Sequence, residues 1–159
     1  MNIAVLGAGA WGTALARMLA AAGHAVTLWG RDSGRVKEIA SGRTNERHLP
    51  GIKLPSALQL QADLSAAIAP ATCVVLAVPS KGFREIAKQL AGFSGVVVSV
   101  TKGIEYETGL TMCGLLQVLA PNARAARNAK LVAAAPREAL TVLGRRAVDA
   151  ECADRSHDG

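Results

Sequence analysis

Three glycines follow the first apolar run of the chain at a spacing that suits phosphate binding. Gly7, Gly9 and Gly12 come directly after Asn2–Leu6 and fit the pattern G-x-G-x-x-G. In this pattern the first glycine permits a tight turn, the second lets the backbone approach a pyrophosphate, and the third lets the next helix lie close to the sheet. The free N–H groups and positive end of that helix attract phosphate. The spacing therefore predicts a dinucleotide site, with a glycine turn that binds nothing as the alternative.

Two charged residues after the next predicted strand, Ala25–Trp29, bear on the choice of nucleotide. Arg31 could hold the 2′-phosphate of NADP by its charge and paired donors. Asp32 could instead bind the ribose hydroxyls of NAD, or it could cap the next helix, because Ser33 and Gly34 follow it. We predict NADP as the favoured cofactor with NAD also accepted, and a solvated surface charge is the alternative role for Arg31.

A lysine stands just beyond the apolar run Val96–Val100, in the segment TKGIEYETG of residues 101–109. Ligands of parallel sheets bind at the carboxyl ends of the strands. Lys102 at that edge could hold a hydroxyl or phosphate oxygen of a substrate near the nicotinamide end of the cofactor. The alternative is a lysine in an ordinary surface turn.

Apolar strands alternate with amphipathic helices over the first 120 residues. We predict strands at 2–6, 25–29, 58–61, 73–78 and 96–100, and helices at 11–22, 36–40, 64–68, 81–90 and 110–119. Asp63 and Ser80 are the predicted caps of two of these helices. Residues 44–55, TNERHLPGIKLP, contain two prolines and no clear period, so we predict a loop. The pattern indicates an α/β fold with a doubly wound parallel sheet covered on both faces.

The composition narrows the class of ligand. The 159 residues suffice for one domain with a core, and the net charge is +6. The basic residues are scattered and only 3% of residues are aromatic, which fits a small phosphorylated ligand better than a nucleic acid. The three cysteines are widely spaced without a CxxC pair, so we predict no metal or redox site, with Cys73 and Cys113 as core thiols. The absence of a signal peptide and of an apolar run of about 18 residues predicts a cytoplasmic protein without a membrane span.

Five segments together resemble a known family. GAGAWGTALA, LWGRD, NERHLPGIKLP, the VPS of Val78–Ser80 and TKGIEYETG occur in this order, as in the N-terminal half of the bacterial NAD(P)-dependent glycerol-3-phosphate dehydrogenases. The resemblance covers residues 1 to about 123 and implies a Rossmann-type NAD(P)-binding domain over 1–123. It implies the family's reaction, in which NAD(P)H reduces dihydroxyacetone phosphate to sn-glycerol 3-phosphate for phospholipid synthesis.

The resemblance also implies roles for individual residues. Ala10, Trp11 and Arg31 are expected to contact the cofactor, beside the three glycines, and Lys102 is expected to contact both cofactor and substrate. Without the resemblance, Trp11 would be assigned to core packing. His48 stands where many relatives have an aromatic residue, and we expect it to be structural.

Residues 124–159 form an Ala- and Arg-rich tail that the resemblance does not cover. It lacks the Ser-Gly-Pro turn that the resemblance implies after Ala123, although residues 129–136 could mimic a strand and residues 137–148 could form a helix. The family's catalytic lysine lies in a second, helical domain without a counterpart in this sequence, so we predict no catalytic residue here. The tail is interpreted either as a shifted or truncated readthrough without a selected fold, or as part of a short variant.

The expected behaviour of the chain alone follows from these points. We expect cofactor binding with little or no turnover, because proton donation and the grip on the substrate phosphate would come from the absent domain. The alternatives are a non-catalytic dinucleotide-binding fragment and a misfolded, rapidly degraded fragment. A homo-oligomer is also left open.

Overall fold

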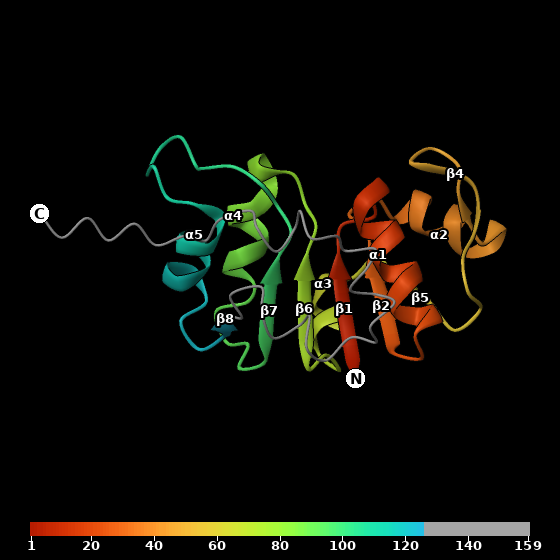
Figure 1. The fold of residues 1–159 in the computed structure, drawn as a ribbon, viewed down its shortest axis with the longest axis horizontal. Helices are drawn as coiled ribbons and strands as arrows, with labels where there is room; N and C mark the ends of the chain where they lie inside the picture. The colour runs from red at the N-terminus through yellow and green to blue at the C-terminus, as the bar shows by residue number, and fades with distance from the viewer. Residues whose placement is uncertain (126–159) are drawn as a thin grey trace, which may run out of the picture.

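The computed structural model describes residues 1–125, which are built around a six-stranded, all-parallel sheet (Figure 1). The strand order is β5-β2-β1-β6-β7-β8. The strands are β1 (Asn2–Leu6), β2 (Ala25–Trp29), β5 (Gln59–Gln61), β6 (Cys73–Leu76), β7 (Val96–Ser99) and β8 (Arg124–Ala125). The helices are α1 (Ala10–Ala21), α2 (Ser33–Gly42), α3 (Leu64–Ile68), α4 (Ser80–Lys88) and α5 (Met112–Leu119). Strand order reverses between β1 and β6, which confirms the predicted doubly wound fold.

Both faces of the sheet are buried, and this explains why its strands are apolar throughout. Successive side chains of a strand point to opposite faces. Ile3 and Val5 pack in one cluster with side chains of α1 and α2, whereas Ala4 and Leu6 pack in a second cluster with Phe83 of α4 and residues of α3 and α5. Two separate apolar cores therefore cover the two faces, as the sequence pattern predicts.

Helix caps follow the predictions at one helix and differ at another. The Asp63 carboxylate accepts a hydrogen bond from Ala66 N at 2.8 Å, as predicted for the start of α3. The prediction for Ser80 is wrong, because Ser80 is already the first residue of α4 and Pro79 holds the cap position without a side-chain bond. The ring of Pro79 fixes its φ near the observed −58° and thus restricts the backbone where the helix begins.

Residues 44–53 form an antiparallel hairpin, which corrects the predicted loop. Its strands are β3 (Thr44–Asn45) and β4 (Leu49–Lys53), and they lie outside the main sheet. Most side chains of β4 are exposed, so the hairpin shows no alternation of apolar and polar residues from which strands could be predicted. We call residues 44–53 "the hairpin" below.

The tail falls almost entirely outside the described residues. The predicted strand at 129–136, the predicted helix at 137–148 and Cys152 all lie there. Arg124 and Ala125, the first residues of that tail, pair in parallel with Val96 and Val97 of β7. Within residues 1–125, no helix is long and apolar enough to cross a membrane.

Candidate functional site

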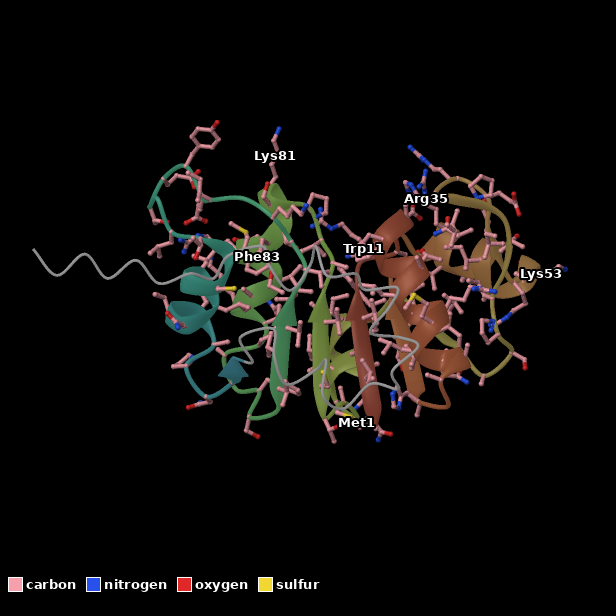
Figure 2. The ribbon with its side chains drawn as sticks, viewed as in Figure 1. Met1, Trp11, Arg35, Lys53, Lys81 and Phe83 are labelled. Carbon is pink, nitrogen blue, oxygen red and sulfur yellow. The ribbon has the colours of Figure 1, made fainter. Side chains whose placement is uncertain are left out.

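A cavity of about 1060 Å³ opens at the carboxyl edge of the sheet. Its wall combines the glycine-rich turn, the residues after β2, the hairpin, the start of α4 and the residues that follow β7. Trp11, Arg35 and Lys81 lie at this edge, whereas Met1 lies at the opposite edge (Figure 2). The cavity thus occupies the place where strand order reverses, which is where open α/β sheets bind their ligands.

Two of the three motif glycines are required by close packing. Gly7 has a φ of +125°, and a Cβ there would lie 2.4 Å from the carbonyl oxygen of Ala77. A Cβ on Gly12 would lie only 1.9 Å from the Gly7 carbonyl oxygen. Neither position can accept a side chain without movement of the backbone, so these glycines form the tight turn and let α1 approach β1.

Gly9 has the opposite surroundings, because a Cβ on it would meet no atom within 4 Å. Its carbonyl accepts from Thr13 N at 2.9 Å and begins α1, so the N–H groups of the first helical turn lack intrahelical partners. Gly9 and Ala10 line the cavity. Open space beside free N–H groups at the positive end of a helix fits the diphosphate of a dinucleotide.

Arg31 and Asp32 differ in how their charges are engaged. Asp32 caps α2: one carboxylate oxygen accepts from Arg35 N at 3.2 Å and the other lies 3.3 Å from Arg35 Nε. Arg31 lines the cavity and extends toward α4, since its guanidinium nitrogen would lie 3.2 Å from a Cβ on Gly82. Among residues 1–125, Arg31 has no hydrogen bond or ion pair. The capping alternative for Asp32 is thus the geometry observed.

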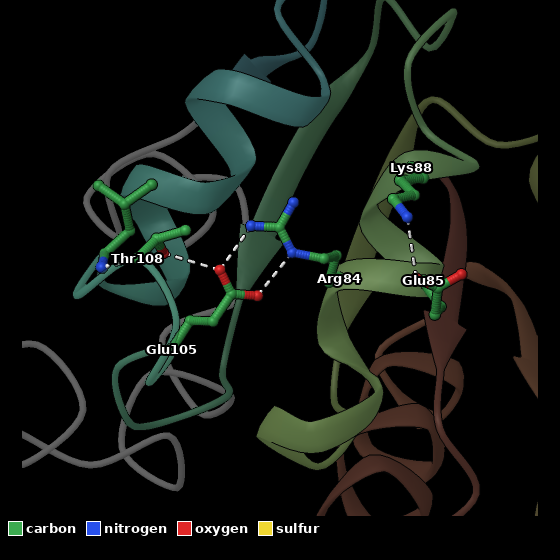
Figure 3. A network of polar contacts seen from close by, with 6 residues as sticks. Arg84, Glu85, Lys88, Glu105 and Thr108 are labelled. Atoms are coloured by element: carbon green, nitrogen blue, oxygen red, sulfur yellow. Dashed lines mark hydrogen bonds and ion pairs between the residues drawn. The ribbon is translucent and has the colours of Figure 1, made fainter.

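Lys102 is exposed, lines the cavity, and stands between two anchored residues. Before it, Thr101 Oγ1 donates to the carbonyl oxygen of Val78 at 2.7 Å. After it, Glu105 accepts two hydrogen bonds from Arg84 of α4, at 2.7 and 2.5 Å (Figure 3). We call residues 101–111 "the Lys102 loop". Its backbone is held on both sides of Lys102 while the ammonium group remains available to a ligand.

The electrostatics of the Arg84–Glu105 pair favour its charged form. The hydrogen bond from Arg84, followed by one from Thr108, lowers the pKa of Glu105 to about 2. The hydrogen bond to Glu105 in turn raises the pKa of Arg84 above its ordinary value. The Glu105 side chain is only 11% exposed, whereas that of Arg84 is 34% exposed. Both groups are charged at neutral pH, and the pair is a fixed bidentate contact between α4 and the Lys102 loop.

Six of the seven predicted cofactor residues line this one cavity: Gly7, Gly9, Ala10, Trp11, Arg31 and Lys102. Gly12 is not part of the wall and acts through packing beneath it. Trp11 is 45% exposed, which argues against the alternative of core packing. His48 also lines the cavity, from the hairpin.

Sequence reasoning missed the polar contact that joins the hairpin to the glycine-rich turn. Asn45 is 3% exposed and its side chain reaches Ala8 and Thr13. The start of α4 was also missed as cavity wall, although the VPS motif ends there and Ser80, Lys81 and Gly82 contribute to it. A helix start after a parallel strand was the available signal for α4. No local pattern marks Asn45.

The cysteines and possible metal ligands are uninformative about the site. Cys73 is fully buried, as predicted, and burial raises the pKa of its thiol to about 11. Cys113 is half-buried on α5. In the part of the chain that the structure describes, no group of three His, Cys, Asp or Glu side chains could hold a metal ion.

The family model and the most similar curated relatives belong to one family. The model described as "NAD-dependent glycerol-3-phosphate dehydrogenase N-terminus" matches residues 2–133. A relative named glycerol-3-phosphate dehydrogenase [NAD(P)+] from Teredinibacter turnerae is 42% identical over 127 residues, which are 78% of this chain and 37% of the relative. One of the same name from Halorhodospira halophila is 49% identical over 109 residues, 68% of this chain and 33% of the relative.

A solved structure supports the same grouping. The crystal structure of glycerol-3-phosphate dehydrogenase from Coxiella burnetii matches with a TM-score of 0.69 and 33% identity, covering 74% of this chain and 37% of that one. The chain thus spans about a third of the length of the curated relatives that it matches.

Proposed function

The chain belongs to the NAD-dependent glycerol-3-phosphate dehydrogenase family, of which it matches the N-terminal domain, and we propose that it binds NADP or NAD in the cavity at the carboxyl edge of its sheet. In the proposed complex the diphosphate lies against Gly9 and Ala10 at the start of α1. Trp11 lies beside the cofactor, and Arg31 is near its adenine ribose. The nicotinamide supplies the hydride when the cofactor is bound. The chain's own residues bind and orient it.

One observation carries the proposal: the open space at Gly9 faces the same cavity as Arg31 and Lys102. These residues come from three different strand–helix junctions that are distant in sequence. A glycine turn that served packing alone would need glycine at positions 7 and 12, where a side chain collides, but not at position 9. An unneeded glycine lowers stability through chain entropy, so its presence at an open position favours a ligand.

We infer that NADP is preferred over NAD. Asp32 also lines the cavity, but its carboxylate already accepts from the backbone and lies beside the side chain of Arg35, so it is less available to ribose hydroxyls than an unengaged carboxylate would be. Arg31 extends over the cavity without an ion pair in the described part of the chain. A 2′-phosphate would give it a bidentate, charge-assisted partner.

We further propose that Lys102 contacts the substrate, taken to be dihydroxyacetone phosphate or sn-glycerol 3-phosphate. Its ammonium group is a mobile donor of three hydrogen bonds between two fixed backbone positions, which suits a hydroxyl or phosphate oxygen. The proposed reaction is hydride transfer from NAD(P)H to dihydroxyacetone phosphate, which gives sn-glycerol 3-phosphate and NAD(P)+. The cytoplasmic location and a homo-oligomeric state stay predictions from the sequence.

Calorimetric titration of the purified chain with NADPH and NADH tests the cofactor site. We expect both to bind, with NADPH bound more tightly, and Arg31→Ala to remove that preference by weakening NADPH about tenfold while leaving NADH within about twofold. Gly9→Val should abolish binding of both nucleotides without loss of cooperative unfolding. Equal weakening of both nucleotides by Arg31→Ala would contradict the 2′-phosphate role, and absence of any binding would contradict the cofactor site.

Turnover separates a dehydrogenase from a pure binding module. Oxidation of NADPH by the purified chain in the presence of dihydroxyacetone phosphate would establish catalysis, and a loss of turnover in Lys102→Ala that clearly exceeds the loss of NADPH affinity would place Lys102 at the substrate as well as at the cofactor. Binding without turnover would favour the binding module for this chain alone.

A further inference from the structure

Asn45 and Thr13 are the two polar residues buried in residues 1–125, with relative exposures of 3% and 0%. They come from different elements, β3 and α1, and they bond to each other. A buried amide without partners costs stability, so a buried asparagine that persists at a cavity wall needs its hydrogen bonds satisfied. Asn45 also lines the cavity, as do its neighbours Thr44, Glu46, Arg47 and His48.

The Asn45 side chain uses both of its N–H donors. Its Nδ2 atom donates to the carbonyl oxygen of Ala8 at 3.0 Å and to the hydroxyl oxygen of Thr13 at 2.8 Å. Because the Ala8 carbonyl can only accept, the atom facing it must be the nitrogen. Thr13 N donates to the Gly9 carbonyl at 2.9 Å, so the Asn45 contacts and the first hydrogen bond of α1 together enclose the turn at Ala8 and Gly9.

The contact to Ala8 has a consequence for the next N–H group. The carbonyl of Ala8 and the N–H of Gly9 belong to one planar trans peptide and point in opposite directions. Holding the carbonyl toward Asn45 therefore holds the Gly9 N–H away from it. Gly9 N has no backbone acceptor among the described residues, and the space beside Gly9 is open.

We propose that Asn45 is a positioning residue for the dinucleotide: by fixing the Ala8–Gly9 peptide it directs the Gly9 N–H at the diphosphate, and it ties the hairpin to the phosphate-binding turn. The proposal rests on the proposed function for its ligand, but the orientation of the peptide is a property of the free protein. This side chain couples cofactor binding to the position of the hairpin, beside a separate bond from Arg17 Nε of α1 to the Lys53 carbonyl oxygen of β4 at 3.1 Å. Asn45 touches no reacting atom.

Amide NMR of the free protein tests the first part. Asn45→Ala removes both donors, and Asn2→Ala is the matched control, because the Asn2 amide also donates to a backbone carbonyl, that of Pro70 at 3.1 Å, at the opposite edge of the sheet. We expect the Gly9 amide resonance to shift or broaden in Asn45→Ala and to be unchanged in Asn2→Ala. An unchanged Gly9 resonance in Asn45→Ala would overturn the inference whether or not nucleotides bind.

Titrations with NADPH and with inorganic pyrophosphate, at a temperature where all variants are folded, test the second part. Pyrophosphate lacks the adenosine and nicotinamide parts of NADPH, so it tests the phosphate-binding turn by itself. We expect Asn45→Ala to raise the Kd of both ligands about tenfold and Asn2→Ala to leave both within about twofold. Weaker NADPH binding with unchanged pyrophosphate binding would assign Asn45 to the hairpin alone and overturn the positioning role. If the wild-type chain binds neither ligand, the proposed function falls, and the Gly9 resonance alone decides the inference.

A second pair of variants applies if Asn45→Ala does not fold. Thr13→Ser keeps the oxygen that accepts from Asn45, whereas Thr13→Val keeps the shape of the side chain and removes the oxygen. We expect the Gly9 resonance and both affinities to resemble wild type in Thr13→Ser, and we expect weakening of about threefold or more in Thr13→Val. Equal behaviour of the two variants would contradict the inference.

Discussion

The two sides of the cavity are held in different ways. On one side, the glycine-rich turn is fixed by close packing at Gly7 and Gly12 and by the neutral amide of Asn45, which joins it to the hairpin. On the other side, the Lys102 loop is fixed to α4 by the charged Arg84–Glu105 pair. The proposed diphosphate lies on the neutral side and the proposed substrate contact on the charged side.

This difference has a physical logic. Close packing and buried amide bonds do not respond to pH or salt, so the turn keeps its shape in any buffer in which the domain is folded. A partly exposed ion pair is screened by salt and weakened by acid. We therefore expect the Lys102 loop to yield first when conditions change.

The largest effect is expected from a side chain introduced into the glycine-rich turn. Gly12→Val places a side chain where even a Cβ would lie 1.9 Å from a backbone oxygen, and we expect destabilisation of about 3 kcal/mol or more. Denaturant unfolding measures it. Gly92→Ala is the control, because a Cβ there meets no atom within 4 Å, and it should remain close to wild type. Similar stabilities for the two variants would contradict the packing argument.

The second-largest effect is expected from removal of the Arg84–Glu105 ion pair, which should loosen the Lys102 loop while the domain stays folded. Arg84→Met removes both hydrogen bonds that Glu105 accepts from α4 and leaves only the one from Thr108 within the loop, so we expect the Lys102 loop to open more often. Tyr106 in this loop is 98% exposed, so chymotrypsin cleavage after Tyr106 should become several-fold faster. Lys88→Met, on the same helix, removes an exposed pair with Glu85 and no hydrogen bond to Glu105, so the cleavage rate should stay close to that of wild type. Equal cleavage rates in Arg84→Met and Lys88→Met would show that the Arg84–Glu105 ion pair does not control the opening of the Lys102 loop.

A smaller effect is expected when pH is lowered, because the stabilisation by the Arg84–Glu105 pair should then decrease. The folded pKa of Glu105, about 2, lies below its ordinary value of 4.5. The unfolded chain thus binds more protons in this range, and the pair's stabilisation is fully present above about pH 4.5 and is lost as pH falls toward 2. The difference in unfolding free energy between wild type and Glu105→Gln should narrow over that window. A difference that stays constant from pH 6 to about 2.5 would show that the pair does not titrate this way.

The smallest effect is that of salt. At about 1 M NaCl the screening length falls to roughly 3 Å, so cleavage after Tyr106 should rise modestly in wild type and remain unchanged in Arg84→Met. The Gly9 amide resonance should be insensitive to the same salt, since its supporting contacts are uncharged. A Gly9 resonance that shifts with salt would contradict the claim that only the Lys102 loop depends on charged contacts.

The sequence predicts the neutral side well where its signals are local. The strand Asn2–Leu6, the glycines and the next helix all follow from residues within about twenty positions of one another. The hairpin was not predictable, because β4 is largely exposed, contains Pro50 and shows no alternation of apolar and polar residues. Asn45 was invisible for another reason: its partners, Ala8 and Thr13, are 37 and 32 residues away in the chain.

On the charged side the sequence predicts the position of Lys102 but not its support. The apolar strand before TKG predicts the edge at which the lysine lies. The pairing of Glu105 with Arg84, 21 residues earlier, depends on how α4 packs against the loop, which no local pattern specifies. The sequence does not decide between ribose binding and helix capping for Asp32, because both roles depend on the orientation of one carboxylate.

The two tryptophans have different surroundings, so their intrinsic fluorescence should distinguish the cavity from the core. Trp29 is 6% exposed and its indole N–H donates to the Ala62 carbonyl at 2.9 Å, whereas Trp11 is 45% exposed at the cavity. Emission from Trp11 should lie at longer wavelength and be quenched by a nicotinamide ring nearby, while emission from Trp29 serves as an internal standard. Ligand binding in the cavity can thus be followed by intrinsic tryptophan fluorescence, without an added dye.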